Sequence, residues 1–278
     1  MLNKNNISNL LNFIKNDKKS TDYQLKILKN KIIKSESAQK ADLIIKKDIL
    51  NFNIKTDQTI KECCEILIPI LINNKKLFFG QIGQSIDGKI ALNNGNSHYI
   101  NEKESITYLH CLRSISDAVI VGVNTVIKDN PLLTTRKITG DDPLRIIIDP
   151  SLKLTNKYKI FKDGNTNIIF TNSSNKKKLN NSAIITLSKK KFTQNIYKYL
   201  EKLSLNYILV EGGPATLSKF IDLKLLDMMQ FIISPTLIGS GINSLKLKPI
   251  NNLKKAIRVK NKISTLGKEI VVTLKLNS

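Results

Sequence analysis

Short apolar segments alternate with segments of helical composition from Leu77 to the C-terminus, and this alternation restricts the possible folds more than any other feature. The expected strands are 77–82, 117–122, 144–148, 167–170, 183–187, 207–210, 229–234, 257–259 and 269–274, and the expected helices are 101–116, 196–203 and 214–221. Asn101 and Glu104 have the spacing of a capping box at the start of the first helix. Such alternation is typical of an α/β fold with a largely parallel central sheet. We therefore expect one α/β domain over residues 76–278.

Residues 1–75 have a different pattern and form a separate part of the predicted organisation. Apolar residues recur at helical spacing over 7–14, 25–32 and 41–49. The segment contains no glycine and a single proline, Pro69, so it lacks the turn chemistry of β-hairpins. We predict a small helical appendage of unassigned role, without a catalytic pattern, that packs on the main domain or on a partner chain.

Composition excludes several classes of protein. The longest apolar run, 66–72, has seven residues and includes Pro69, which is too short for a transmembrane helix. The first ten residues have no apolar core of signal-peptide length, so we expect a cytoplasmic protein. Three cysteines, with Cys63 and Cys64 adjacent, form no disulfide framework, and there are only two histidines. We expect buried thiols and no metal site.

The formal net charge of +23 raises the question of nucleic-acid binding. The charge comes from 41 lysines and four arginines, and the lysines are scattered along the chain rather than gathered with aromatic residues. We interpret most of this charge as a solvated surface and keep RNA binding on an inactive enzyme fold as the alternative. Because lysine is the usual cation in this chain, the arginines mark positions where a planar, bidentate donor matters. They are Arg113, Arg136, Arg145 and Arg258.

The strongest local signal is the turn Glu211-Gly212-Gly213-Pro214, which links an expected strand to an expected helix. Glycines after a strand let the backbone approach a ligand, and the first N–H groups of a helix carry partial positive charge. A phosphate or pyrophosphate suits that position, and Glu211 lies at the carboxyl end of a strand, where open α/β sheets bind ligands. The turn matches neither the Gly-x-Gly-x-x-Gly fingerprint nor a Walker A loop. Considered alone, it is equally an ordinary turn whose glycines serve only geometry.

A second stretch carries three polar groups beyond another expected strand. After Gly122, the Thr125 hydroxyl, the Asp129 carboxylate and the Arg136 guanidinium follow in one helical turn and loop. These groups suit a polar, phosphorylated substrate. The alternative is a surface loop in which Asp129 caps a turn and pairs with Arg136.

A third stretch, residues 81–100, contains the turn Asp87-Gly88 and the loop residue Ser97, which singly favour structural roles. Together, the three motifs resemble the reductase domain of the bifunctional riboflavin-biosynthesis deaminase/reductase family, over roughly residues 78–241. The matching stretches are GQIGQSIDGKIA, SHYI, CLRSISDAVIVGVNTVIKDNPLLTTR, PLRIIIDP, YILVEGGPATL and IISPTLIGSG. The resemblance implies a dihydrofolate reductase-like fold of three layers with a mostly parallel central sheet.

The resemblance also implies an activity and a site. The activity is the NADPH-dependent reduction of 5-amino-6-(5-phosphoribosylamino)uracil to its ribitylamino counterpart, with hydride transfer to C1′ of the ribose. Carried over by motif position, the substrate contacts would be Ser97, Arg113, Leu133, Arg136 and Glu211. The cofactor contacts would be Gly83, Tyr99, Thr125, Asp129, Ser151, Gly212, Gly213, Pro214, Ala215, Thr216 and Leu217. Asp129 and Glu211 are the implied catalytic residues, and the family commonly forms homodimers.

The sequence departs from the family pattern in three places. The His-x-Glu and Pro-Cys-x-x-Cys signature of the zinc deaminase domain is absent from residues 1–75, so we expect no deaminase activity from this chain. Tyr99 stands where tryptophan is frequent, and Asp227-Met228 stands where Asp-Glu is frequent. These changes leave open a reductase of a related pyrimidine or a pterin. Because every matched motif lies beyond Leu77, we expect a chain without residues 1 to about 70 to fold and to bind the cofactor.

Overall fold

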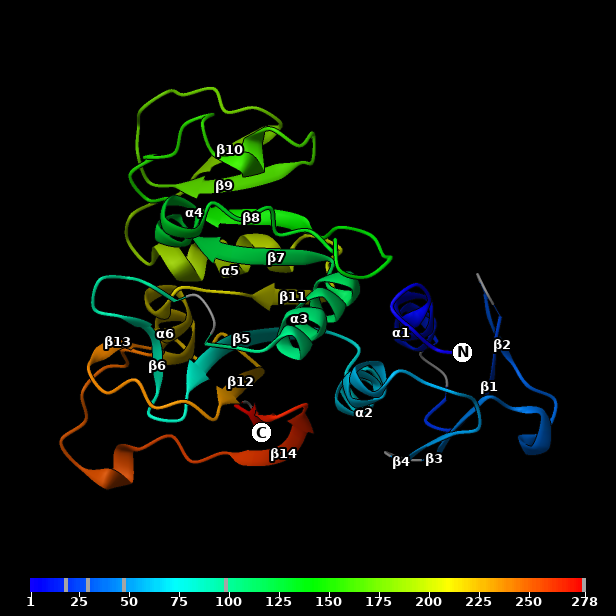
Figure 1. Cartoon of the computed structure of the whole chain (residues 1–278). Helices are drawn as coiled ribbons and strands as arrows, with labels where there is room; N and C mark the ends of the chain where they lie inside the picture. Colours follow the sequence, from blue (N-terminus) through cyan, green and yellow to red (C-terminus); the bar gives the residue numbers. More distant parts are fainter. Residues whose placement is uncertain (18–19, 29–30, 47–48, 98–99, 277–278) are drawn as a thin grey trace.

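Seven parallel strands form the centre of the molecule, as the strand–helix alternation predicts. The computed structural model describes residues 1–278 except 18–19, 29–30, 47–48, 98–99 and 277–278. The strands of the main sheet are β5 (Leu77–Ser85), β7 (Ala118–Gly122), β8 (Leu144–Ile148), β9 (Asn167–Thr171), β10 (Ser182–Thr186), β11 (Tyr207–Val210), β12 (Met228–Ser234), β14 (Lys260–Leu266) and β15 (Glu269–Lys275). The helices around it are α3 (Lys103–Ile115), α4 (Val123–Asp129), α5 (Phe192–Glu201) and α6 (Pro214–Asp222). The order is β10-β9-β8-β7-β11-β5-β12-β15-β14, in which β15 pairs antiparallel with both of its neighbours, β12 and β14 (Figure 1).

Alternate residues of the central strands face two separate apolar cores, which produces three layers. In β7, Val119 and Val121 face the core that includes α3, whereas Ala118 and Ile120 face the core that includes α5 and α6. Parallel strands covered on both faces are rich in apolar residues, which explains why the sequence presents β7 and β11 as short apolar runs. The predicted α/β fold with a mostly parallel sheet is confirmed. No helix in the described part of the chain is long and apolar enough to span a bilayer.

The N-terminal segment contains a β-sheet, so the prediction of a helical appendage over residues 1–75 is wrong for much of its length. Between α1 (Ile7–Asn16) and α2 (Gln58–Asn73) lie the strands β1 (Tyr23–Ile27), β2 (Ile32–Lys34), β3 (Leu43–Lys46) and β4 (Ile49–Phe52). They pair antiparallel in the order β2-β1-β3-β4. Leu25 and Leu43 are buried while Lys26 and Lys46 are exposed, which is the two-residue period of a half-buried strand. Over such short stretches this period overlaps with helical spacing.

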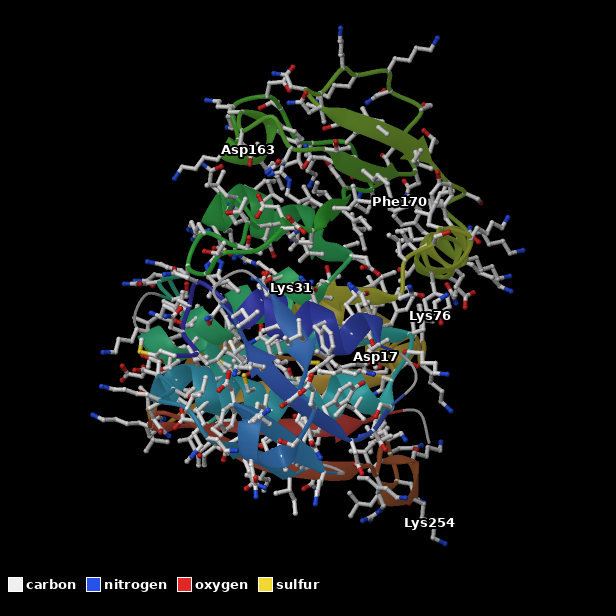
Figure 2. The ribbon with its side chains drawn as sticks, turned by 90° about the vertical axis from the view of Figure 1, so that its right-hand side faces the viewer. Asp17, Lys31, Lys76, Asp163, Phe170 and Lys254 are labelled. Carbon is white, nitrogen blue, oxygen red and sulfur yellow. The ribbon has the colours of Figure 1, made fainter. Side chains whose placement is uncertain are left out.

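Residues 1–75, here called the N-terminal unit, share one apolar core with the α/β domain. Its helices α1 and α2 pack on α3, and their buried side chains form a single cluster with those of β5, β7 and β11. Cys63 of α2 and Cys111 of α3 are buried thiols in this cluster. Viewed from the side of the N-terminal unit, the end of the sheet that carries Asp163 and Phe170 is left uncovered (Figure 2). Removing the unit would expose the apolar face of α3 that it covers, which opposes the folding of a shortened chain. The expectation that a chain without residues 1 to about 70 folds and binds the cofactor stays a prediction.

Two local predictions are wrong. Residues 257–259 are not a strand, since β14 begins only at Lys260. The capping box does not form, because α3 begins at Lys103 without a side-chain cap. Asn101 instead donates its amide to Glu269 Oε1 at 2.7 Å, and this bond ties the start of α3 to β15.

Candidate functional site

A cleft of about 610 Å³ opens at the carboxyl ends of the parallel strands β5, β7, β8 and β11. Because neighbouring parallel strands end at the same edge of the sheet, the turns that follow them meet there. The predicted residues that line the cleft are Gly83, Ser97, Thr125, Asp129, Glu211, Gly212, Gly213, Pro214, Ala215 and Thr216. The structure thus brings most of the predicted residues, from all three motifs, to one place.

The turns after β7 and β11 contact each other at the base of the cleft, and only glycine fits there. Gly213 has a φ of 33°, and an added Cβ would lie 3.1 Å from Thr125 Oγ1. At Gly122 an added Cβ would lie 2.5 Å from Thr216 Oγ1. The first turn of α6 faces the cleft directly behind this glycine turn. A bare backbone beside a helix N-terminus is the arrangement that binds phosphate groups.

Glu211 is fixed at the cleft by a bidentate ion pair with Arg113. Arg113 Nε donates to Glu211 Oε1 and Nη2 donates to Oε2, both at 2.6 Å, and each side chain is only 7% exposed. Arg113 Nη1 donates to the Thr134 carbonyl at 3.0 Å. Burial acts to lower the pKa of the Arg113 guanidinium, but the charge and hydrogen bonds of Glu211 outweigh it and raise that pKa. Arg113 therefore lies behind Glu211 and reaches the cleft only through it.

Four other predicted residues lie away from the lining. Leu133 and Leu217 are buried in the two apolar cores, Leu133 with a left-handed backbone at a φ of 58°. Arg136 is exposed on the loop that follows α4, and Ser151 is exposed just beyond β8. Tyr99 lies outside the described residues. Motif position alone therefore does not distinguish residues that contact the cleft from residues that shape it.

The hypothesis that arginines mark bidentate sites holds for two of the four. Besides Arg113, the fully buried Arg145 binds Asp163 through Nη1 at 2.5 Å and Nη2 at 2.9 Å. Arg145 Nη1 also donates to the Leu132 carbonyl at 3.1 Å, and this hydrogen bond holds the loop between α4 and β8 against β8. Arg136 and Arg258 are exposed.

Sequence reasoning missed one wall of the cleft, formed by β6 (Lys89–Leu92) and β13 (Gly241–Asn243), which pair antiparallel. Ile90 and Ile242 line the cleft from this wall. Asp87 fastens it, because its carboxylate accepts from the Ser85 hydroxyl at 2.5 Å and from the Gly239 N–H at 2.6 Å. These two hydrogen bonds lower the pKa of Asp87 to about 2. The turn Asp87-Gly88 was the only sequence signal for this wall, and it did not reveal that Asp87 binds Gly239, which is distant in sequence.

A second cavity of about 760 Å³ adjoins the cleft and shares residues with it. It is lined by residues 93–97, Lys128, Asp129 and Ile242. Lys128 was not predicted, and neither were Phe192 and Thr193, which line the cleft at the start of α5. Lys128 lies inside the second motif without having been singled out, and no motif covers Phe192 and Thr193. The adjoining cavity adds the amide groups of Asn93, Asn94 and Asn96 beside Lys128, which lines both cavities.

Comparison with protein families and curated proteins gives consistent results. The model of the family described as the RibD C-terminal domain matches residues 79–272. The riboflavin biosynthesis protein RibD of Aquifex aeolicus is 37% identical over 198 residues, which are 69% of this chain and 55% of that protein. The 2,5-diamino-6-ribosylamino-4(3H)-pyrimidinone 5′-phosphate reductase of Methanothermobacter thermautotrophicus is 26% identical over 201 residues, 68% of this chain and 92% of that protein. The chain spans little more than half of the RibD relatives that it matches.

Solved structures give the same fold. A diaminohydroxyphosphoribosylaminopyrimidine deaminase/5-amino-6-(5-phosphoribosylamino)uracil reductase of Thermotoga maritima has a TM-score of 0.64 and 26% identity, over 81% of this chain and 64% of that chain. The riboflavin biosynthesis reductase Rib7 of Saccharomyces cerevisiae has a TM-score of 0.56 and 21% identity, over 73% and 90% of the two chains. At that identity, the second likeness shows the fold alone.

Proposed function

The chain belongs to the RibD C-terminal domain family, and on this premise we propose that it is a pyrimidine reductase of riboflavin biosynthesis. The reaction would be the NADPH-dependent reduction of 5-amino-6-(5-phosphoribosylamino)uracil to the ribitylamino product. The observation that carries the proposal is the juxtaposition of Glu211, fixed by Arg113, with the Gly212-Gly213 turn in one cleft. One part of the cleft suits a dinucleotide phosphate, and the other part presents a fixed carboxylate to a polar substrate.

The residues at the base of the cleft fit a dinucleotide cofactor. A side chain at Gly122 or Gly213 would fill the space between the two turns. With glycine at both positions, the backbone and the hydroxyl groups of Thr125 and Thr216 stay accessible there. The hydroxyl groups of Thr125 and Thr216 would donate hydrogen bonds to phosphate oxygens beside the N-terminus of α6. The high net positive charge is compatible with the additional 2′-phosphate of NADPH. We therefore assign NADPH as the cofactor.

The proposed chemistry needs one hydride, one proton and an opened sugar. When bound, NADPH supplies the hydride to C1′ of the ribose. The ribose must first open to an imine, whose nitrogen takes up a proton as the hydride arrives. Asp129 lies where the cleft meets the adjoining cavity, and we assign it to this proton transfer. Glu211 would accept hydrogen bonds from the substrate and so hold C1′ in position.

The remaining substrate contacts follow from position and charge. Ser97 lines both cavities, and its hydroxyl would donate a hydrogen bond to the substrate. Lys128, which lines both cavities, would bind the substrate phosphate. Arg136 is exposed outside the lining, and we keep it as a second phosphate contact on the family resemblance. The family resemblance further supports a homodimer in the cytoplasm.

A second candidate is reduction of the pyrimidine before its deamination. The Methanothermobacter relative is named for that substrate, and its match covers nearly the whole of that protein. We expect NADPH consumption by the purified chain to be fastest with the uracil substrate, slower with the diaminopyrimidinone and absent with a dihydropterin. A faster reaction with the diaminopyrimidinone would favour the second candidate. Tight, steeply salt-dependent RNA binding without NADPH binding would replace both with the RNA-binding alternative.

A further inference from the structure

The N-terminal unit holds the loop that joins α4 to β8, which carries the proposed substrate contact Arg136. The Thr139 N–H donates to the Lys4 carbonyl at 3.1 Å. Ile138 is buried in the same apolar cluster as Leu10 and Leu11 of α1. The unit thus contacts this loop through both its backbone and its apolar core.

Gly140 is the closest point of this contact. A Cβ on Gly140 would lie 2.6 Å from Ser8 Oγ, and it would lie 3.1 Å from the Cβ atoms of both Ser8 and Ser114. Ser8 belongs to α1 and Ser114 to α3, so the loop passes between the two helices with no room for a side chain. Its φ lies outside the left-handed region, so space rather than backbone conformation requires glycine here.

From Gly140, hydrogen bonds lead to the cleft. Thr135 Oγ1 donates to the Gly140 carbonyl at 2.8 Å, which closes the loop on itself. The carbonyl of the preceding residue, Thr134, accepts from Arg113, and Arg113 holds Glu211 through its two 2.6 Å bonds. A displacement of the loop at Gly140 therefore reaches Glu211 through Thr135, Thr134 and Arg113.

A second contact of the N-terminal unit lies at the start of β11, the strand that leads to Glu211. Lys15 of α1 pairs with Asp117 at 2.6 Å, and their side chains are only 14% and 25% exposed. Asp117 accepts from the Tyr207 N–H at 3.0 Å, and Tyr207 also donates its hydroxyl to the Asn74 carbonyl. Tyr207 is the first residue of β11, the strand that ends immediately before Glu211.

We propose that the N-terminal unit is a positioning element of the reductase site. By fixing the loop at Gly140 and the start of β11, it fixes the Arg113–Glu211 pair and the backbone that carries Arg136. Among the described residues, no backbone hydrogen bond joins the Gly212-Gly213 turn directly to α1, so we expect the cofactor part of the cleft to change less than the Arg113–Glu211 pair. This inference rests on the proposed function, because it treats Glu211 and Arg136 as substrate contacts.

A set of full-length variants tests the proposal. Gly140→Ala should push the loop away from α1 and raise KM for the pyrimidine roughly tenfold, because overpacked sites shift their backbone. The Kd of NADPH, measured by nicotinamide fluorescence, should stay within about twofold. Adding Ser8→Gly removes the closest contact and should restore much of the KM. Asn9 is the exposed neighbour of Ser8 in α1. Adding Asn9→Gly instead destabilises the helix to a similar extent but should not restore the KM.

Two outcomes would overturn the inference: a Gly140→Ala variant with wild-type KM, or equal rescue by Ser8→Gly and Asn9→Gly. Hydrogen exchange separates the inference from the proposed function. In Gly140→Ala, amides of residues 133–142 and 207–211 should exchange faster than in the wild type, whichever substrate the enzyme uses. Unchanged exchange at residues 207–211 would sink the inference. A wild-type chain without reductase activity would sink the proposed function, and the exchange data would still decide the coupling.

Discussion

The buried Arg113–Glu211 pair is the residue-scale feature on which the site depends. A carboxylate this little exposed needs a partner that meets both oxygens, and the guanidinium does so with two parallel hydrogen bonds. In a chain where nearly every other cation is lysine, a planar donor was kept at this position. In the proposed site, Arg113 would therefore position Glu211 rather than contact the substrate itself.

Arg113→Lys should therefore weaken both stability and turnover. A lysine ammonium cannot reach both oxygens and the Thr134 carbonyl in one plane, so about 1.5–3 kcal/mol of charged hydrogen bonding is lost. We expect kcat/KM for the pyrimidine to fall at least tenfold and Tm to fall by several degrees. Arg258→Lys, at an exposed site, is the matched control and should change neither. Wild-type kinetics in Arg113→Lys would show that the bidentate geometry is dispensable.

His110 gives the molecule a specific loss of stability in mild acid. Its side chain is 1% exposed, and burial, followed by the nearby charge of Arg113, lowers the pKa of His110 to about 4. The unfolded chain has a histidine pKa of about 6.5, so between these values only the unfolded state binds the proton. The free energy of unfolding therefore rises with pH in this window and is lost as the pH falls from 6.5 towards 4.

Urea unfolding measures this effect. We expect the free energy of unfolding to be about 2 kcal/mol lower at pH 5 than at pH 7 through His110 alone. His110→Gln, which cannot titrate, should lose that part of the pH dependence. The Asp87 carboxylate, whose pKa is about 2, does not interfere, because its contribution is lost only at lower pH. An unchanged slope in His110→Gln would contradict the assignment.

At the scale of elements, the glycine turn between β11 and α6 is the part of the proposed cofactor site that can be tested separately. Gly213→Ala places a Cβ at a φ of 33° and 3.1 Å from Thr125 Oγ1, so the turn must open. We expect the Kd of NADPH to rise roughly tenfold or more. Gly164→Ala, at a φ of 84° with nothing within 4 Å, is a control for backbone strain without contact. Equal NADPH affinity in both variants would remove the turn from the cofactor site.

Elements also show where the sequence was sufficient and where it was not. Strands β8 and β11 were predicted with their observed bounds, because each is a short run dominated by large apolar residues, with Arg145 the one charged residue of β8. The N-terminal strands were mistaken for helix, because they are short and half-buried and no glycine marks their turns. Within the site, residues next to strand ends were predicted. The contact of Arg113 with Thr134 and the place of Phe192 in the cleft were not, because both depend on packing between distant segments.

At the scale of the whole molecule, the N-terminal unit and the α/β domain fold around a common core, and the cleft lies at the opposite end of β11 from the Lys15–Asp117 pair. This arrangement explains how a segment without catalytic motifs can still belong to the enzyme. The unit covers the apolar face of α3, and its first helix supports a loop of the site. The N-terminal unit and the α/β domain therefore form one structural body within the described residues.

We propose that this cleft supports hydride transfer from NADPH to C1′ of a phosphoribosylated aminopyrimidine. The most direct test is to incubate the full chain with 5-amino-6-(5-phosphoribosylamino)uracil and NADPH carrying deuterium at both C4 positions, and to locate the label in the product by mass spectrometry and NMR. We expect a ribitylamino product with one deuterium at C1′, formed by the wild type and much more slowly by Gly213→Ala. A product without deuterium at C1′, or no product while NADPH still binds, would contradict it.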